Sequence, residues 1–160
     1  MKVTKKAGVI SGNPKRYGYQ KLKNGDGIGV TDSHFAIRVY DTEVIASLVE
    51  KDFASEFMDI DKVVDNVFSG VSRPVSIDIA SVKLANLTEN KYLELIKDQL
   101  YINAEYALMA FQMAGNPKEI TFLCRGDDKP DLCPVYIKGS ENCWDMVIAP
   151  YSTKRVKSNR

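Results

Sequence analysis

The last third of the chain, residues 100–151, predicts a strand, a helix and three more strands, and this order is what most constrains the fold. The helix is predicted over residues 104–114, because Asn103 before it is a preferred N-cap and Gly115 after it is a preferred stop. Nearly all side chains between these two residues are apolar. A helix of this composition is buried on most of its surface, so we expect it inside a core.

Short apolar runs that predict strands lie on both sides of this helix. Residues 100–102 precede it, and residues 120–124, 134–137 and 144–149 follow it, separated by segments rich in Gly, Asp, Asn and Ser. Consecutive short strands that pack on one helix form an α+β unit with an antiparallel sheet. We therefore expect an α+β fold.

A two-residue alternation predicts further strands near the start of the chain. Residues 17–22 alternate, residues 24–27 form a strong hairpin signal, and residues 28–40 alternate again. The alternation is interrupted at residues 31–34, which indicates a bulge or kink inside one strand. A short helix is predicted at residues 43–51, within an otherwise loosely patterned acidic stretch.

A second capped helix is predicted in the middle of the chain. A strand at residues 75–79 leads into a helix at residues 79–87, with Asp78 in the position that Asn103 has before the other helix. Strand, Asx cap and helix thus occur twice, which hints at a domain of two related halves. The predicted architecture is antiparallel sheets packed on two helices.

Length and hydropathy place the chain among ordinary globular proteins. Its 160 residues are expected to form one domain, residues 1–160. No apolar run approaches the roughly 18 residues that a membrane span needs, so we expect none. The first residues lack the apolar core of a signal peptide, so we expect a cytoplasmic protein.

The net charge of +1 conceals an uneven distribution of charge. Residues 1–23 hold seven Lys or Arg and no acid, and residues 154–160 hold four more and no acid, which leaves 22 − 11 = 11 basic against 21 acidic residues elsewhere. The basic ends could contact a nucleic-acid backbone, or residues 1–16 and 152–160 could be flexible, solubilising tails. The candidate DNA-binding residues are Lys2, Lys5, Lys6, Lys15, Arg16, Lys154, Arg155 and Lys157.

The sequence contains no recognisable catalytic or metal-binding motif, and no cofactor is expected. The cysteines, at 124, 133 and 143, have no zinc-like spacing and are expected to be small buried hydrophobes, with a metal site or a nucleophile as the alternative. Asp59 and Asp61 could bind a cation, or belong to a solvated loop. An enzyme would have to bring Asp32, His34 and Cys124 together in space; we expect a non-enzymatic protein.

Five segments, in order, resemble the bacterial DNA polymerase sliding clamps, the β subunit family. Residues 29–38 are similar to that family's "T-D-G/S-H-R-L-A" segment, and residues 57–64 to its linker into the last domain. Residues 102–108 resemble its strand-to-helix junction, and residues 134–137 and 147–151 its final strands. The chain departs from the family in its length, since clamps have three such domains in each of two chains.

The resemblance implies a clamp-like domain that binds short peptide motifs, with a Gln and a hydrophobic end, from replication or repair proteins. It suggests a processivity factor of a phage or mobile element, a homo-oligomer that could encircle double-stranded DNA. The alternative is a decoy or adaptor that binds the same partners without DNA. The positions that match the clamp's peptide pocket are Thr31, Ser33, His34, Met58, Lys62, Val63, Asn103, Tyr106, Leu132, Pro134, Ala149, Pro150 and Tyr151.

Overall fold

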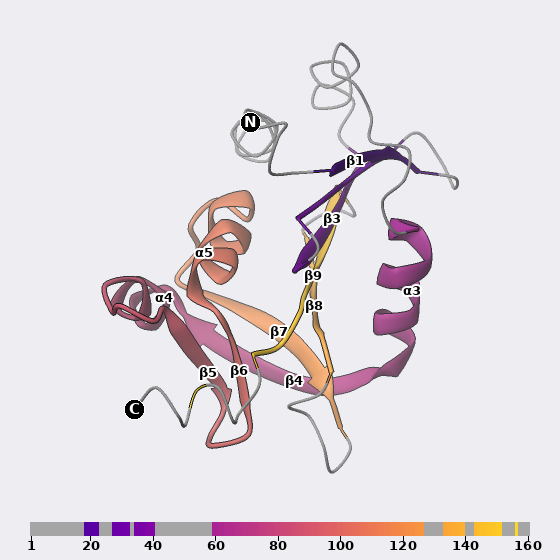
Figure 1. The fold of residues 1–160 in the computed structure, drawn as a ribbon. Helices are drawn as coiled ribbons and strands as arrows, with labels where there is room; N and C mark the ends of the chain where they lie inside the picture. The colour runs from indigo at the N-terminus through magenta and orange to yellow at the C-terminus, as the bar shows by residue number, and fades with distance from the viewer. Residues whose placement is uncertain are drawn as a thin grey trace.

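The computed structural model describes residues 18–22, 27–32, 34–40, 59–126, 133–139, 143–151 and 156. Within these residues lie nine strands and three helices (Figure 1). The strands are β1 (Gly18–Lys21), β2 (Ile28–Thr31), β3 (Phe35–Val39), β4 (Val71–Asp78), β5 (Tyr92–Ile96), β6 (Leu100–Asn103), β7 (Glu119–Arg125), β8 (Val135–Lys138) and β9 (Trp144–Ile148). The helices are α3 (Ile60–Gly70), α4 (Ile79–Asn86) and α5 (Ala104–Met113).

Seven of the strands form one antiparallel sheet in the order β1-β2-β3-β9-β8-β7-β4, and β5 and β6 form a second, two-stranded sheet. Helix α3 lies on one face of the large sheet, and α4, α5 and the small sheet lie on the other (Figure 1). The expected α+β class with antiparallel sheets is therefore confirmed.

Alternating side chains of the large sheet fill two separate cores. Ile37 on β3 and its cross-strand partner Met146 on β9 are fully buried in the larger core, with α5 and the small sheet. Their neighbours Ala36 and Val147 point to the other face and pack with Ile60 of α3. Because successive strand residues face opposite sides, one alternating sequence supplies both cores.

Two helices begin at the predicted caps. The Asp78 side chain accepts a hydrogen bond from the backbone N–H of Ser81 at the start of α4. The Asn103 side chain accepts one from the N–H of Glu105 at the start of α5. The predicted helices at 79–87 and 104–114 are thus confirmed to within a residue at each end, as is the repeated order of strand, Asx cap and helix.

The structure corrects two predictions in the first half of the chain. Residues 31–34 do not form a bulge inside one strand: β2 and β3 pair antiparallel with Thr31 opposite Ala36, so the chain reverses there. A third helix, α3, follows Asp59, whose side chain caps it by accepting from the Lys62 N–H, where only a linker was expected. The predicted helix at 43–51 lies outside the described residues.

In the part of the chain that the structure describes, no helix is both long and apolar enough to cross a membrane.

Candidate functional site

Most of the predicted peptide-pocket residues line two cavities that share His34 and Ala149. The first, here called the polar cavity, has a volume of about 330 Å³; the second, the apolar cavity, measures about 150 Å³. The polar cavity is lined by His34, Asn103, Tyr106, Ala149, Pro150 and Tyr151. The apolar cavity is lined by His34, Phe35, Ala36, Val63, Pro134, Val147 and Ala149.

The segment that follows β9 forms one wall of the polar cavity and is held at both ends by backbone hydrogen bonds. The N–H of Ala149 donates to the carbonyl of His34 at 2.9 Å, and the N–H of Tyr151 donates to the carbonyl of Tyr101 at 2.8 Å. The Tyr151 ring also packs edge-on against Tyr92, with centroids 4.7 Å apart. These contacts join the end of the large sheet to the small sheet and fix the wall between them.

Two polar side chains of the polar cavity are available to a ligand. The imidazole of His34 is exposed, and neither of its nitrogens bonds any described residue. The Asn103 oxygen caps α5, accepting from Glu105 N at 2.8 Å, which leaves its amide nitrogen without a described partner. A donor amide beside an imidazole suits a ligand that carries a side-chain amide or a backbone carbonyl.

The apolar cavity has almost no hydrogen-bonding side chain. Apart from His34, its lining residues are all apolar, and they come from β3, α3, β9, the residue after β9 and the residue before β8. Phe35 is 2% exposed, and its ring packs against that of Tyr106 with centroids 5.0 Å apart. The floor of this cavity is therefore part of the core, and the space above it suits an apolar side chain.

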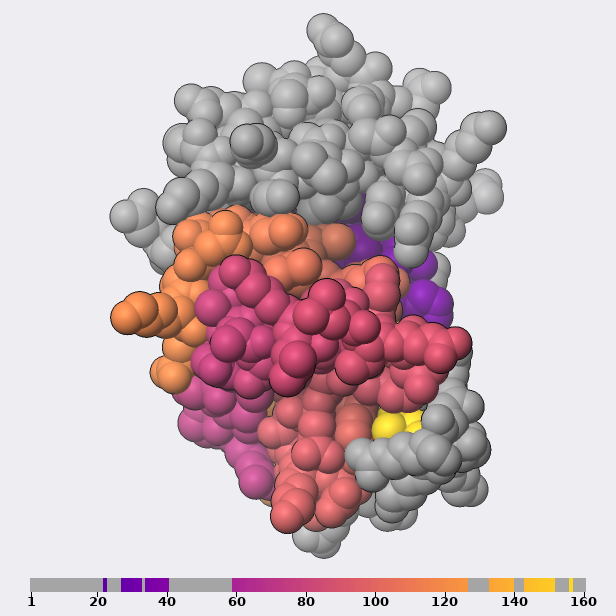
Figure 2. Space-filling model, turned by 90° about the vertical axis from the view of Figure 1, so that its left-hand side faces the viewer, coloured from indigo at the N-terminus to yellow at the C-terminus, as the bar shows by residue number. Residues whose placement is uncertain are grey.

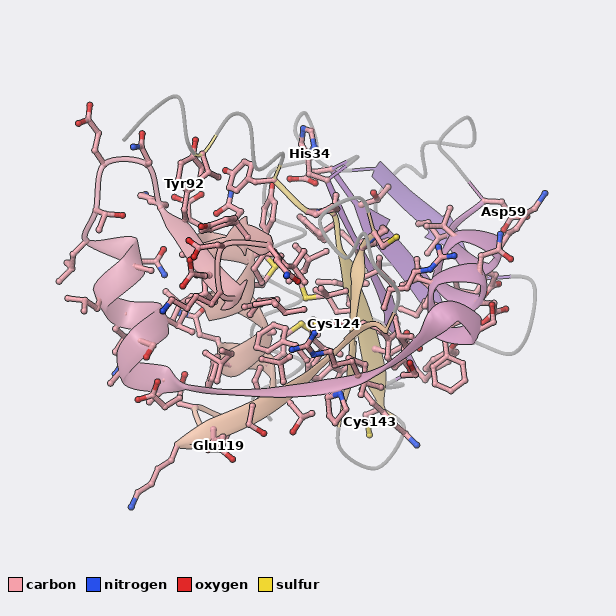
Figure 3. The ribbon with its side chains drawn as sticks, turned by 90° about the horizontal axis from the view of Figure 1, so that it is seen from below. His34, Asp59, Tyr92, Glu119, Cys124 and Cys143 are labelled. Atoms are coloured by element: carbon pink, nitrogen blue, oxygen red, sulfur yellow. The ribbon has the colours of Figure 1, made fainter. Side chains whose placement is uncertain are left out.

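Helix α3, which carries Val63, is tied to the sheet by Arg38 of β3. The guanidinium donates to both carboxylate oxygens of Asp145 on β9, at 2.9 and 2.6 Å. Its Nη1 also donates to two carboxylates of α3, Asp65 at 2.8 Å and Asp61 at 3.2 Å. The hydrogen bond to Asp145 is the main cause of a raised pKa of Arg38, so the cation persists at all ordinary pH values. Figure 3 shows α3 with its cap residue Asp59.

The remaining predicted pocket residues do not line either cavity or lie outside the described part of the chain. Thr31 is fully buried, and its hydroxyl donates to the Phe35 carbonyl at 2.6 Å across the turn. Lys62 is exposed and lines neither cavity. Of thirteen predicted residues, eight therefore line the cavities and two do not. Ser33, Met58, Leu132 and all eight candidate DNA-binding residues lie outside the described residues.

Sequence reasoning missed four residues that build the site: Phe35, Ala36 and Val147 in the apolar cavity, and Arg38 behind it. The first three read as ordinary strand residues. Arg38 offered a weak signal, because it is a charged residue within an alternating apolar strand, where an ion-pair partner is expected.

The structure does not bring Asp32, His34 and Cys124 together as an enzyme would need. Cys124 is fully buried in the larger core, and burial raises the pKa of its thiol to about 11. Figure 3 shows it well away from His34. Both oxygens of Asp32 accept hydrogen bonds from neighbouring groups. These three residues therefore cannot act as one catalytic set.

Asp59 and Asp61, the other acidic pair considered, have structural partners. Asp59 caps α3 and Asp61 accepts from Arg38. Among the described residues, no three His, Cys, Asp or Glu side chains are grouped so as to hold a metal ion.

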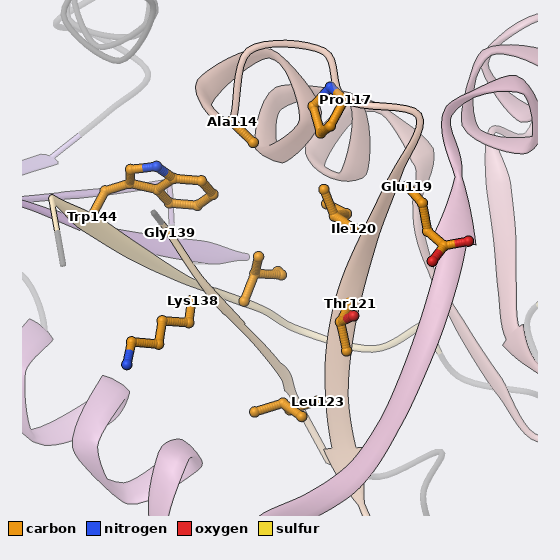
Figure 4. A pocket seen from close by; sticks show the side chains of 10 residues that line it. Ala114, Pro117, Glu119, Ile120, Thr121, Leu123, Lys138, Gly139 and Trp144 are labelled. Carbon is orange, nitrogen blue, oxygen red and sulfur yellow. The ribbon is translucent and has the colours of Figure 1, made fainter. Parts of the chain in front are cut away.

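A larger cavity of about 500 Å³ lies between β7 and β8 (Figure 4). The two strands pair only at Leu123 and Tyr136 and then diverge, and Trp144 lines the opening. None of the predicted pocket residues reaches it. Its lining is mainly apolar, with Glu119, Thr121 and Lys138 as the polar side chains, and the Glu119 carboxylate points away from the cavity in Figure 4.

Comparisons of the chain with protein-family models, with curated proteins and with solved structures find no match. The polar and apolar cavities are the basis for a functional proposal. Together they offer a small polar recess next to an apolar one, built on rigid strand ends and a helix start. Among the described residues, the polar side chains that this arrangement offers to a ligand are His34 and Asn103.

Proposed function

We propose that this chain is a non-enzymatic module of the sliding-clamp type that binds short peptide motifs of replication or repair proteins. One observation carries the proposal. Eight residues singled out for a peptide pocket, scattered from residue 34 to residue 151, line two cavities that share His34 and Ala149. Residues chosen for an unrelated reason would be spread over the molecule.

The two cavities match the two parts of such a motif. A Gln side chain or a backbone carbonyl of the peptide would accept from the Asn103 amide in the polar cavity. The hydrophobic end of the motif would enter the apolar cavity, beside Val63 and Pro134. Burying two or three apolar groups contributes about 1.5–3 kcal/mol each. After the costs of association and ordering, we expect roughly micromolar affinity, which suits a reusable docking site.

The test is a fluorescence-anisotropy titration of a labelled peptide that has a Gln followed by a hydrophobic C-terminal end. Wild-type protein should bind it with a micromolar Kd. Tyr151→Asp in the polar cavity and Val63→Asp in the apolar cavity should each weaken binding at least tenfold. Asn90→Asp, which adds the same charge at an exposed position after α4, should not. If both pocket variants bind as well as wild type, the proposed site is wrong.

A specific observation favours the adaptor variant of this function over a clamp that encircles DNA. Clamp bores are lined by helices whose Lys and Arg face the phosphates. Here α5 has no basic residue and α4 has only Lys83. We therefore favour a module that binds the peptides without DNA between its helices. Binding to closed circular DNA that is lost on linearisation would favour the encircling clamp instead.

A further inference from the structure

Helix α4 is apolar on two opposite faces, and the fold buries only one of them. Val82 on the inner face is fully buried in the larger core. The outer face carries Ala80, Leu84 and Leu87, spaced four and three residues apart, which places them in one stripe along the helix. Leu84 is 67% exposed and Leu87 84% exposed. An apolar face of a helix is normally covered by another element or another molecule.

The outer stripe of α4 is defined as Ala80, Leu84 and Leu87, which are all exposed. Helix α4 itself lies near the centre of the view in Figure 2. Two exposed leucines one turn apart cannot interact favourably with phosphates or with water. The stripe therefore fits an apolar surface of another protein molecule.

We propose that the outer stripe of α4 is covered by the same stripe of a second copy of this chain, with the two helices antiparallel about a twofold axis. In such a pair Leu84 of each copy packs against Leu87 of the other copy. The two stripes have the same length, so each covers the other. An interface that uses the same patch on both subunits is the commonest way in which identical chains assemble.

The charges beside the stripe favour the antiparallel arrangement. Lys83 lies on α4 and Glu89 lies just beyond its C-terminal end; both are exposed, and neither has a described partner. Antiparallel pairing brings the C-terminal end of each helix toward the middle of the other. Lys83 of each copy then lies near Glu89 of the other copy, which gives two equivalent ion pairs. Parallel pairing would place Lys83 beside Lys83. Antiparallel helix dipoles favour the same arrangement.

This inference goes beyond the peptide-binding function and does not depend on it. A dimer closed through α4 covers the helical face that a clamp would turn toward DNA. It would therefore carry two peptide sites on one particle and leave no helix-lined bore. Two linked sites increase the apparent affinity for a partner that carries two motifs.

Sedimentation equilibrium of the full chain, from low micromolar to several hundred micromolar concentration, tests the proposal. Wild type should show a reversible monomer–dimer equilibrium. Leu84→Lys and Leu87→Lys should each raise the dimer Kd at least tenfold. The control is Phe68→Lys on α3, where the replaced side chain is also apolar and 54% exposed. A monomer at every concentration, or an equal effect of the control, would overturn the proposal.

Charge exchange tests the orientation separately. Lys83→Glu and Glu89→Lys should each raise the dimer Kd about fivefold, and the double variant should restore the wild-type value, as in a double-mutant cycle. Both positions are on the surface, so circular dichroism should show unchanged folding. If the double variant is as weak as the two single effects combined, Lys83 and Glu89 do not meet and the antiparallel arrangement is wrong.

Discussion

The hydroxyl of Tyr106 on α5 donates a hydrogen bond to Asp32 Oδ2 at 2.5 Å, and the other oxygen of this carboxylate closes the turn between β2 and β3. There Asp32 Oδ1 accepts from the backbone N–H of His34 at 2.8 Å and of Phe35 at 3.0 Å. One carboxylate thus fixes both the turn that presents His34 and the helix that begins after Asn103. Both of these elements line the polar cavity.

Tyr106→Phe should lower the free energy of unfolding by about 1–3 kcal/mol, the usual range for a lost hydrogen bond to a charged, part-buried group. Urea denaturation of wild type, Tyr106→Phe, Asp32→Asn and the double variant forms a double-mutant cycle. The two single effects should not add, because each removes the same interaction. Additive effects would show that the contact between α5 and the turn contributes nothing of its own.

Arg38→Met should lower the free energy of unfolding far more than the similar volumes of the two side chains suggest. It would leave Asp61 and Asp145 as carboxylates in a largely buried place without their cation, since their side chains are 8% and 9% exposed. Breaking such a pair on one side costs about 3–5 kcal/mol. Lys91→Met is the control, because its ion pair with Glu105 is exposed and such pairs are worth about 0–1 kcal/mol. Similar losses in the two variants, measured by urea denaturation, would contradict this.

Local signals were enough to predict α5 and α4, because each is preceded directly by its Asx cap, and α5 is also followed by Gly115. They were not enough for the β2–β3 hairpin, since an alternating strand with a bulge and two alternating strands joined by a turn have the same pattern of apolar residues. What separates them is the Asp32 side chain, which closes the turn by accepting two backbone N–H bonds.

The sequence did not predict helix α3 or the ion pairs of Arg38. Ile60 and Val64 have helical spacing, yet Asp59 and Asp61 suggested a solvated loop. In the folded chain Asp59 caps α3, and Asp61 accepts from Arg38, which lies 23 residues away and also bonds Asp145, 107 residues away. No local pattern reports contacts at such separations. Periodicity did not group the residues that line the two cavities; they were listed together only through the sliding-clamp resemblance, which stays a prediction.

Burial of Cys124 should make the free energy of unfolding fall as the pH rises through the alkaline range. Its folded-state pKa, about 11, lies above the ordinary value of 9.0 because burial disfavours the thiolate. The unfolded thiol therefore loses its proton first, and the stability that is fully present below pH 9 declines as the pH rises toward 11. Between pH 9 and pH 11 the free energy of unfolding should fall less in Cys124→Ala than in wild type, and the two drops should differ by up to about 3 kcal/mol. Parallel pH curves from denaturation at pH 8 to 11 would contradict the assignment.

Gly139→Ala should destabilise the fold, because the added methyl group would clash with Trp144, the chain's single tryptophan. A Cβ at this position would lie 2.5 Å from three atoms of the Trp144 ring, which is 1% exposed and cannot move aside. Nor can the backbone retreat easily, because the Gly139 N–H donates to the Trp144 carbonyl at 2.8 Å. We expect a loss of about 1–3 kcal/mol, typical of overpacking, together with a shift in tryptophan emission. Gly70→Ala is the matched control, since no atom lies within 4 Å of its added Cβ; an equal loss there would refute the steric explanation.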